Sequence, residues 1–228
     1  MDYSKATLII PTLNERENLP ILLDYVFSSY PGIKVIVADD GSLDGTRELV
    51  TSAAKKNKHL SLIDRSQREV KGLTASVVEG LLAAKSELAV VIDGDLQHPP
   101  EKIKEMVSAL QDNELVVGTR RRVLSKWPIH RKLISKLATI MARLRLRRRI
   151  QDPVSGFFGI RTMTFKGIYA KSHRHFMLEG YKLLFDILKY LPADARIGQV
   201  MYDFGSRNAG SSKIKNKHII LFFKSLFE

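Results

Sequence analysis

Short apolar runs alternate with amphipathic stretches through the first half of the chain. The runs occupy residues 6–10, 34–38, 60–63, 87–92 and 114–118. They are mostly unbroken, which is typical of strands that are covered on both faces of a parallel sheet. Helical patterns fill the gaps between them, over about 14–28, 45–56, 72–84 and 99–111. This order predicts one α/β domain with a largely parallel sheet flanked by helices.

Local signals mark where these helices begin. Asn14 and Glu17 have the spacing of a capping box for the first helix. Asp44 is placed to cap the second helix. Pro99 and Pro100 open the fourth, at a position where proline costs no backbone hydrogen bond.

A different pattern runs through residues 128–148, where apolar and basic positions share one predicted helix. An apolar stripe with basic shoulders is what a helix at a membrane interface requires. The alternative is a helix that packs on the domain and exposes a basic back. We expect a domain over 1–213 that includes this helix, followed by an amphipathic, possible interfacial segment over 214–228. The stripe consists of Leu133, Leu137, Ile140, Met141 and Leu144.

The positive charge is concentrated in the same region. The 228-residue chain has a formal net charge of +13. No acidic residue lies between Glu114 and Asp152, and twelve lysines and arginines fall in that stretch. Such a block indicates a polyanionic partner, which could be nucleic acid, an anionic membrane surface or a phosphorylated substrate.

Composition excludes several classes of protein. The chain has no cysteine, which rules out disulfides and thiolate sites. Its N-terminal stretch lacks the basic and apolar regions of a secretory signal. No apolar run reaches the roughly 18 residues of a membrane span. Four of the six histidines, at 98, 130, 173 and 175, are candidate metal ligands by residue type but lack the spacing of a metal site, which favours surface or structural roles.

Polar clusters follow three of the predicted strands, at residues 11–15, 39–42 and 93–97. Ligands of open α/β sheets bind beyond the C-terminal ends of the strands, so the three clusters are expected to form one site. Asp39 is suited to accept hydrogen bonds from a nucleoside base or ribose. The loop from Arg207 to Lys213 carries two cations that could close over a diphosphate, or it is simply an exposed basic loop.

Asp93 and Asp95 are two residues apart at the end of an apolar run. While the chain stays extended, both carboxylates point to the same side and repel each other. Mg²⁺ or Mn²⁺ bound to a substrate diphosphate would relieve that repulsion. Gln97 adds a neutral oxygen or an amide donor, and Gly94 lets the backbone approach a ligand. The alternatives are an acidic turn that caps the next helix and a carboxylate pair for acid/base chemistry.

Six motifs occur in order across nearly the whole chain. Together they closely resemble family 2 glycosyltransferases of the dolichol-phosphate mannose synthase type, which have the GT-A fold. At Leu13 and Gly94 the family usually has tyrosine and alanine. The motifs are IIPTLNERENLP, DDGSLDGT, DGDLQHPPE, SKWPIHRKLISK, DPVSGFFGIR and RNAGSSK.

The resemblance implies roles for residues at matching positions. The expected nucleotide pocket consists of Pro11, Leu13, Glu15, Val37 and Asp39, the last two holding the base and ribose. The expected metal and diphosphate ligands are Asp93, Gly94, Asp95 and Gln97. The expected phosphate contacts are Arg120 for donor or acceptor, Arg131 and Ser135 for the acceptor, and Arg207 and Lys213 for the donor.

The resemblance also implies an activity. It is the inverting transfer of mannose from GDP-mannose to dolichyl or polyprenyl phosphate, with Mg²⁺ or Mn²⁺, on the cytoplasmic face of a membrane. The acceptor phosphate would attack the sugar C1 without a general base and give a β-linked product. Family members with transmembrane helices continue past residue 228, so the chain is expected to be a short form or a truncation.

Three alternatives stay open. One is a UDP-glucose-dependent polyprenyl-phosphate glucosyltransferase. Another is a glycosyltransferase that acts on a protein or polysaccharide away from membranes. The third is a non-catalytic nucleic-acid-binding protein that uses the arginine block. Aromatic residues do not interleave with those arginines, so no nucleic-acid partner is expected.

Overall fold

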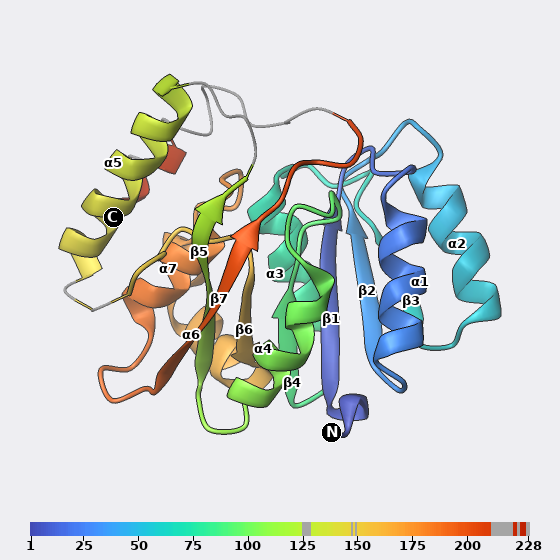
Figure 1. Ribbon diagram of the computed structural model, residues 1–228, viewed down its shortest axis with the longest axis horizontal. Helices are drawn as coiled ribbons and strands as arrows, with labels where there is room; N and C mark the ends of the chain where they lie inside the picture. The colour runs from blue at the N-terminus through green and yellow to red at the C-terminus, as the bar shows by residue number, and fades with distance from the viewer. Residues whose placement is uncertain (125–128, 147, 149, 211–220, 223, 227–228) are drawn as a thin grey trace.

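A computed structural model of the chain describes residues 1–124, 129–146, 148, 150–210, 221–222 and 224–226. Within 129–146, the side chains are described from residue 137 onward. The described residues form one seven-stranded sheet with the strand order β3-β2-β1-β4-β6-β5-β7 (Figure 1). The seven strands are β1 (Ala6–Thr12), β2 (Lys34–Asp39), β3 (Leu60–Asp64), β4 (Leu88–Val91), β5 (Leu115–Val123), β6 (Phe158–Arg161) and β7 (Ile197–Phe204).

The five strands predicted from apolar runs are all present, and the largely parallel sheet is confirmed. β1 pairs in parallel with β2 and β4, β2 with β3, and β5 with β7. β6 is the exception, because it runs antiparallel to both β4 and β5. Neither β6 nor β7 was predicted. The half of the sheet that contains β1 to β4 therefore follows the sequence pattern more closely than the half built from β5 to β7.

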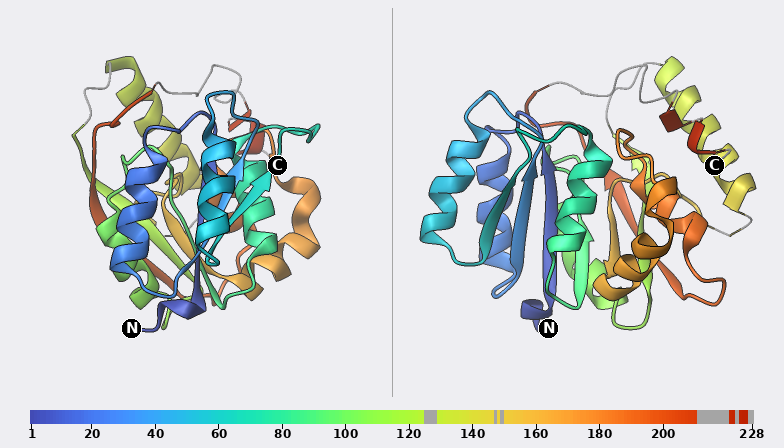
Figure 2. Two further views of the ribbon diagram at one scale, coloured as in Figure 1. Left: turned by 90° about the vertical axis from the view of Figure 1, so that its right-hand side faces the viewer. Right: turned by 180° about the vertical axis from the view of Figure 1, so that it is seen from behind.

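Helices cover both faces of this sheet (Figures 1 and 2). One buried cluster joins one face of the sheet to α1, α2 and α4, and a second cluster joins the opposite face to α3, α6 and α7. The bounds are α1 (Leu19–Ser29), α2 (Thr46–Lys56), α3 (Leu73–Ala83), α4 (Ile103–Ala109), α5 (Ile129–Leu146), α6 (Thr162–Ser172) and α7 (Leu183–Tyr190). Short 3₁₀ turns lie at Tyr3–Lys5, Pro100–Lys102 and His173–His175.

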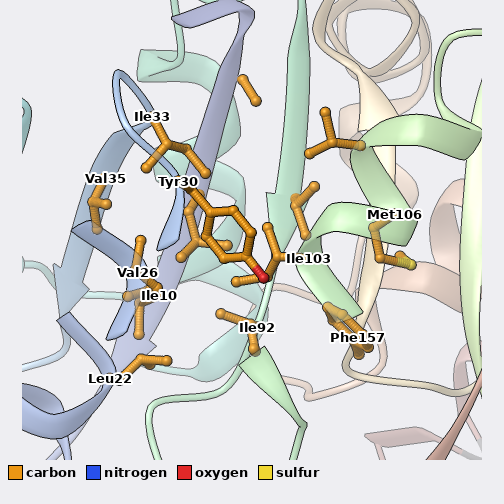
Figure 3. Packing of buried hydrophobic residues seen from close by; sticks show 14 of the residues in the cluster. Ile10, Leu22, Val26, Tyr30, Ile33, Val35, Ile92, Ile103, Met106 and Phe157 are labelled. Atoms are coloured by element: carbon orange, nitrogen blue, oxygen red, sulfur yellow. The ribbon is translucent and has the colours of Figure 1, made fainter. Parts of the chain in front are cut away.

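Tyr30 closes the core beneath α1 and α4. Figure 3 shows its ring between Val26 of α1 and Ile103 of α4. Its hydroxyl donates to the Pro100 carbonyl at 2.8 Å, so the ring is buried with its polar atom satisfied. This contact fixes the start of α4 and, with it, the loop that follows β4.

One of the predicted helix starts is wrong, and another needs a small correction, because Gly45 and not Asp44 is the N-cap residue of α2. The Asn14–Glu17 capping box is wrong, because α1 begins at Leu19, after Asn18. Asn14 has a positive φ of 54°, and its side-chain oxygen accepts a hydrogen bond from the Leu43 N–H at 2.8 Å. It therefore ties the loop after β1 to the loop after β2. The capping role of Asp44 is closer to the prediction, since its carboxylate accepts the first N–H of α2 at 3.0 Å.

Helix α5 packs on the domain through small residues. Ala138 and Ala142 are buried in a cluster with Phe185 of α7. Leu137, Ile140 and Leu144 of the predicted stripe remain exposed, at 50%, 43% and 74%. These three residues, called the α5 apolar stripe below, form an apolar ridge on the outer face of the helix. Among the described helices, none combines the length and the hydropathy needed to cross a bilayer.

The predicted interfacial segment over 214–228 is described only in part. Of its described residues, Phe222 and Leu226 are buried with the alanines of α5. Ser225 is also buried, and it donates to Asp186 of α7 at 3.1 Å. These side chains belong to the core of the domain and are not available to lipid. The interfacial role of the segment stays a prediction, because residues 214–220 lie outside the described part.

Candidate active site at the carboxyl ends of the strands

The loop after β4 carries the two carboxylates that the sequence singles out. The side chain of Asp95 is 7% exposed and that of Asp93 is 29% exposed. One oxygen of Asp95 accepts the Gln97 N–H at 3.0 Å. Burial, followed by the negative charge of Asp93, raises the pKa of Asp95 above its usual range, and Arg207 opposes that rise. The pair is thus arranged so that a nearby positive charge stabilises it.

Arg207 supplies such a charge. One nitrogen of its guanidinium lies 2.6 Å from Oδ2 of Asp95, and another donates to Oε1 of Glu15 at 3.2 Å. Glu15 is buried in the loop after β1. The structure therefore brings together Glu15, Asp95 and Arg207, three residues that sequence analysis assigned to separate motifs.

The loop that carries Arg207 is anchored over the strand ends. The Gly205 N–H donates to the Gln97 carbonyl at 2.8 Å, and the Gln97 side-chain amide donates back to the Gly205 carbonyl at 3.0 Å. Asn18 accepts from Asn208 and donates to the Ala209 carbonyl. Figure 1 shows this segment, in red, crossing the tops of β4 and β1.

A cavity of about 900 Å³ opens beside the anchored loop. Its walls come from the loop after β1, the starts of α1 and α2, and the end of the anchored loop. The lining residues are Asn14, Glu15, Arg16, Glu17, Asn18, Pro20, Asp44, Leu49, Ala209 and Gly210. Of the expected nucleotide pocket, only Glu15 lies in this wall, and Leu13 is half-buried next to it.

The loop after β2 is more enclosed. Asp39 is fully buried, and its carboxylate accepts from the Thr12 hydroxyl, the Gly41 and Ser42 N–H groups and the Ser42 hydroxyl. Val37 is also fully buried, and Pro11 lies buried in β1. The role of Asp39 at the base and ribose stays a prediction. In this structure its oxygens are engaged by the chain itself.

Arg120 lies in β5, which is on the other side of β4 from β1 and β2 in the sheet. Asp152 binds its guanidinium through two bonds, at 2.6 and 3.0 Å. Burial opposes the charge of Arg120, but Asp152 outweighs burial and raises the pKa of the guanidinium. Phe204 lies against it at 5.9 Å. Asp152 is the first residue of the DPVSGFFG motif. One function of the motif is therefore to hold Arg120, which the spacing of residues in the sequence did not reveal.

Most of the described arginines of the block are bound by acceptors within the domain. Arg121 pairs with Asp203 at 2.8 Å, and Arg148 donates to the Leu191 carbonyl at 2.6 Å. Intramolecular acceptors of this kind reduce the number of cations that a polyanion could reach. The described arginines of the block that bind such acceptors are Arg120, Arg121, Arg143, Arg145 and Arg148.

Three expected phosphate contacts cannot be placed. Arg131 and Ser135 lie in α5, but their side chains are outside the described part of the chain, and so is Lys213. Gly94 is compatible with the alanine that the family has there, because an added Cβ would lie 3.4 Å from the nearest atom, which belongs to Thr12.

The donor set fits a hard divalent cation. No group of three or more His, Cys, Asp and Glu side chains that could hold a metal occurs among the described residues. Mg²⁺ in nucleotide sites commonly uses only one or two carboxylates and completes its shell with phosphate oxygens and water. The carboxylate of Asp93 can offer one oxygen to such a cation, because no donor from the described residues reaches its Oδ1. Asp95 pairs with Arg207, a cation that a metal ion could replace.

Comparisons with known proteins identify the class. The glycosyl transferase family 2 model matches residues 7–169. A dolichol-phosphate mannosyltransferase of Pyrococcus furiosus is 35% identical over 98% of this chain, which spans 63% of that relative's length. A protein of the same name from Saccharomyces cerevisiae is 33% identical, with 100% and 86% coverage.

Solved structures agree on the fold. A glucosyl-3-phosphoglycerate synthase from Mycobacterium tuberculosis, crystallised with Mn²⁺, UDP and glucosyl-3-phosphoglycerate, superposes with a TM-score of 0.68 at 20% identity. The match covers 99% of this chain and 80% of that one. The mannosyl-3-phosphoglycerate synthase of Rubrobacter xylanophilus gives 0.68 at 18% identity, with 97% and 72% coverage. The chain belongs to glycosyl transferase family 2, has the GT-A fold and is a glycosyltransferase.

Proposed function

We propose that the protein transfers mannose from GDP-mannose to the phosphate of a dolichol or another polyprenol, with inversion at C1. The observation that carries the proposal is the acidic end of β4, where Arg207 from a distant loop holds Asp95. The exposed α5 apolar stripe on the same domain supports a lipid acceptor. The names of the relatives, which include an undecaprenyl-phosphate mannosyltransferase of Micrococcus luteus at 29% identity, support a polyprenyl phosphate as acceptor.

The reaction needs no general base from the protein. A phosphate monoester has a second pKa of about 6 and is largely dianionic at neutral pH. One of its oxygens forms the bond to C1 as the bond from C1 to the donor diphosphate breaks, and the diphosphate leaves with the electron pair. A single displacement of this kind gives the β-linked product. The work of the chain is to align the two phosphates and to stabilise the charge that develops.

Named residues can divide that work. Asp93, Asp95 and Gln97 would hold Mg²⁺ or Mn²⁺, which would neutralise the leaving nucleoside diphosphate. We expect Arg207 to exchange its partner Asp95 for the diphosphate, and Lys213, six positions later in the sequence, to bind the same diphosphate. Arg120, whose guanidinium is held by Asp152, would contact the donor or acceptor phosphate, and Arg131 and Ser135 would contact the acceptor phosphate.

A donor screen tests the assignment. We expect the purified protein with Mg²⁺ or Mn²⁺ to transfer mannose from GDP-mannose to a short polyprenyl phosphate. NMR of the product should show a β linkage. Transfer from UDP-glucose alone would replace the mannose assignment by the glucosyltransferase alternative. A protein that neither transfers sugar to the polyprenyl phosphate nor hydrolyses any nucleotide sugar would contradict the proposal.

Peripheral binding to the cytoplasmic face of a membrane is the second part of the proposal. The α5 apolar stripe supplies an apolar face beside basic side chains, as an interfacial helix requires. We expect the double variant Leu137→Gln with Leu144→Gln to lose flotation with anionic liposomes. Met163→Gln is the matched control, because Met163 is 76% exposed on α6, away from α5. Equal flotation of the double variant and wild type would contradict the membrane assignment.

A further inference from the structure

His98 lies directly behind the paired carboxylates, in a pocket of aromatic rings. The residue is 2% exposed. Its ring lies 5.5 Å from that of Phe157, 5.4 Å from that of Tyr202 and 5.2 Å from that of Phe204. Sequence analysis favoured a surface or structural role for this histidine, and its burial rules out the surface role. An imidazole in such a place costs free energy unless its polar atoms find partners.

Only one nitrogen of the ring has a partner. Nε2 of His98 lies 3.1 Å from Oδ2 of Asp93. Nδ1 is buried and has no hydrogen-bond partner. A proton on Nδ1 would be a buried donor without an acceptor, so the neutral ring carries its proton on Nε2 and donates it to Asp93. A phenylalanine would fill the same pocket without an orphaned nitrogen, so packing alone does not account for a histidine here.

Gly156 covers this hydrogen bond. A Cβ at this position would lie 3.2 Å from Oδ2 of Asp93 and 3.5 Å from Nε2 of His98. The backbone of the DPVSGFFG motif therefore passes closer to the pair than a residue with a side chain comfortably could. Close packing around the buried imidazole lowers the local dielectric constant on its side of the hydrogen bond, and this strengthens the bond.

The consequence concerns Asp93. His98 holds Oδ2, while the side chain stays 29% exposed and no described donor reaches Oδ1. One oxygen is thus fixed by the protein and the other is presented to the site. Hydrogen bonds to a ligating carboxylate set its orientation at a metal site.

We propose that His98 is a positioning residue that orients Asp93 for a divalent cation. The inference rests on the metal site of the proposed function and adds a residue that acts through Asp93 without contacting the metal. It also explains why the DPVSGFFG motif must approach the DGDLQHPPE motif, since Gly156 and Phe157 of the first enclose His98 of the second.

Three substitutions separate orientation from packing. His98→Phe keeps a ring and removes the donor. His98→Gln places an amide N–H close to the position of Nε2, whereas His98→Asn is too short to reach Asp93. With Mn²⁺ titrated in the presence of GDP and free Mn²⁺ measured by electron paramagnetic resonance, we expect His98→Phe and His98→Asn to bind Mn²⁺ about 10- to 100-fold more weakly. His98→Gln should restore affinity close to that of wild type.

The readouts distinguish this inference from the function on which it rests. Thermal unfolding of each variant shows whether a loss of affinity merely follows a loss of folding. Equal Mn²⁺ affinity in wild type and a folded His98→Phe variant would overturn the role of His98 and leave the glycosyl transfer untouched. A wild-type protein that binds no Mn²⁺ with GDP would overturn the metal site and, with it, the inference.

A second measurement does not depend on the metal. Long-range ¹H–¹⁵N NMR of the histidine rings reports which nitrogen carries the proton. We expect His98 to carry it on Nε2. A neutral ring that is protonated on Nδ1 would overturn the proposal, because such a ring could not donate to Asp93.

Discussion

Two acidic strand ends of the same sheet have opposite degrees of internal satisfaction. After β2, the chain's own donors saturate Asp39, and Asp40 pairs with the buried Arg65 and accepts the Gly72 N–H at 2.8 Å. After β4, Asp93 has one neutral donor, and Asp95 is held by a backbone N–H and by Arg207 from a distant loop. The residue types are the same, but the partners differ.

The difference indicates which end is structural and which end is built to exchange a cation. Arg65 is 1% exposed and lies five residues from Val70, whose carbonyl it also binds, so it is part of the local fold. Arg207 is 21% exposed and reaches Asp95 from a loop that lies far away in the sequence. If Arg207 moves away from Asp95, another positive charge must replace it, because a buried carboxylate without a cation is costly. A divalent metal ion would supply that charge.

The acidic end of β2 is called the closed end below, because the chain's own donors saturate it, and the acidic end of β4 is called the open end. The largest expected effect is on the closed end. We expect Arg65→Met to lower the free energy of unfolding by about 3–5 kcal/mol, because it leaves the half-buried Asp40 without its cationic partner and removes one of the two arginines that bind Glu79. Urea unfolding followed by circular dichroism measures the change. Arg68→Met is the matched control, since Arg68 is 60% exposed and pairs with the same Glu79 at 3.3 Å.

The control variant should lose less than about 1 kcal/mol, as is typical of exposed ion pairs. If Arg65→Met and Arg68→Met were equally stable, the end of β2 would not be the rigid structural element that the comparison makes it.

The next effect is on the open end, and it concerns activity. We expect Asp95→Asn to lower transfer by on the order of 100-fold or more, through loss of a charged metal ligand. Its stability should stay close to that of wild type, because the amide oxygen can still accept the Gln97 N–H. Initial rates at saturating donor, together with thermal unfolding, test both statements.

Asp39→Asn is the counterpart at the closed end. Its new amide would face the Gly41 and Ser42 donors, so we expect a loss of stability of about 1–3 kcal/mol. A highly active Asp95→Asn variant would remove the distinction between the two ends.

The sequence was sufficient to predict five of the strands and the polar loops at their ends. Unbroken apolar runs identified β1 to β5, and the motif order located the loops that follow them. It was insufficient where partners are far apart. Arg207 lies 112 positions after Asp95 and 192 after Glu15, so no local pattern links them. β6 has only four residues, and β7 alternates buried and exposed positions, which weakens the signal of an apolar run.

His98 illustrates the same limit at the scale of one residue. Its ring pocket is assembled from Phe157, which directly precedes β6, and from Tyr202 and Phe204 of β7, and the apolar pattern revealed neither strand. The glycine in DPVSGFFG was the one available signal, because glycine allows close backbone approach. What it approaches could be known only once β4 and β6 were paired.

A smaller effect is expected from that glycine. Gly156→Ala would push a Cβ against Asp93 and His98, and we expect about tenfold weaker Mn²⁺ binding in the presence of GDP. Gly167→Ala is the control, because Gly167 lies within α6 and an added Cβ there meets no atom within 4 Å.

The control should bind Mn²⁺ like wild type and gain up to about 1 kcal/mol of stability, as alanine favours a helix over glycine. Unchanged Mn²⁺ affinity in Gly156→Ala would mean that the open end tolerates displacement of Asp93, and the contrast with the closed end would weaken.

The smallest effect comes from a third acidic strand end, at Asp64 after β3. Its side chain is 48% exposed, and it accepts the Ser66 N–H at 2.8 Å and pairs with Arg47 at 3.2 Å. The Ser66 hydrogen bonds, with Arg47 as a lesser cause, hold the pKa of Asp64 below its ordinary 3.8. Because the folded pKa is depressed, the stabilisation is present above that ordinary value and is lost as the pH falls through the folded pKa.

We therefore expect Asp64→Asn to cost about 0.5 kcal/mol at neutral pH, after screening by solvent, and nothing at a pH below the depressed pKa. Urea unfolding of both proteins at the two pH values measures the difference. A cost that persists in acid would show that the Asp64 side chain acts through shape, not charge. A charge effect of this size would rank the three strand ends by enclosure, with Asp64 as the exposed reference against which the buried pairs at β2 and β4 are judged.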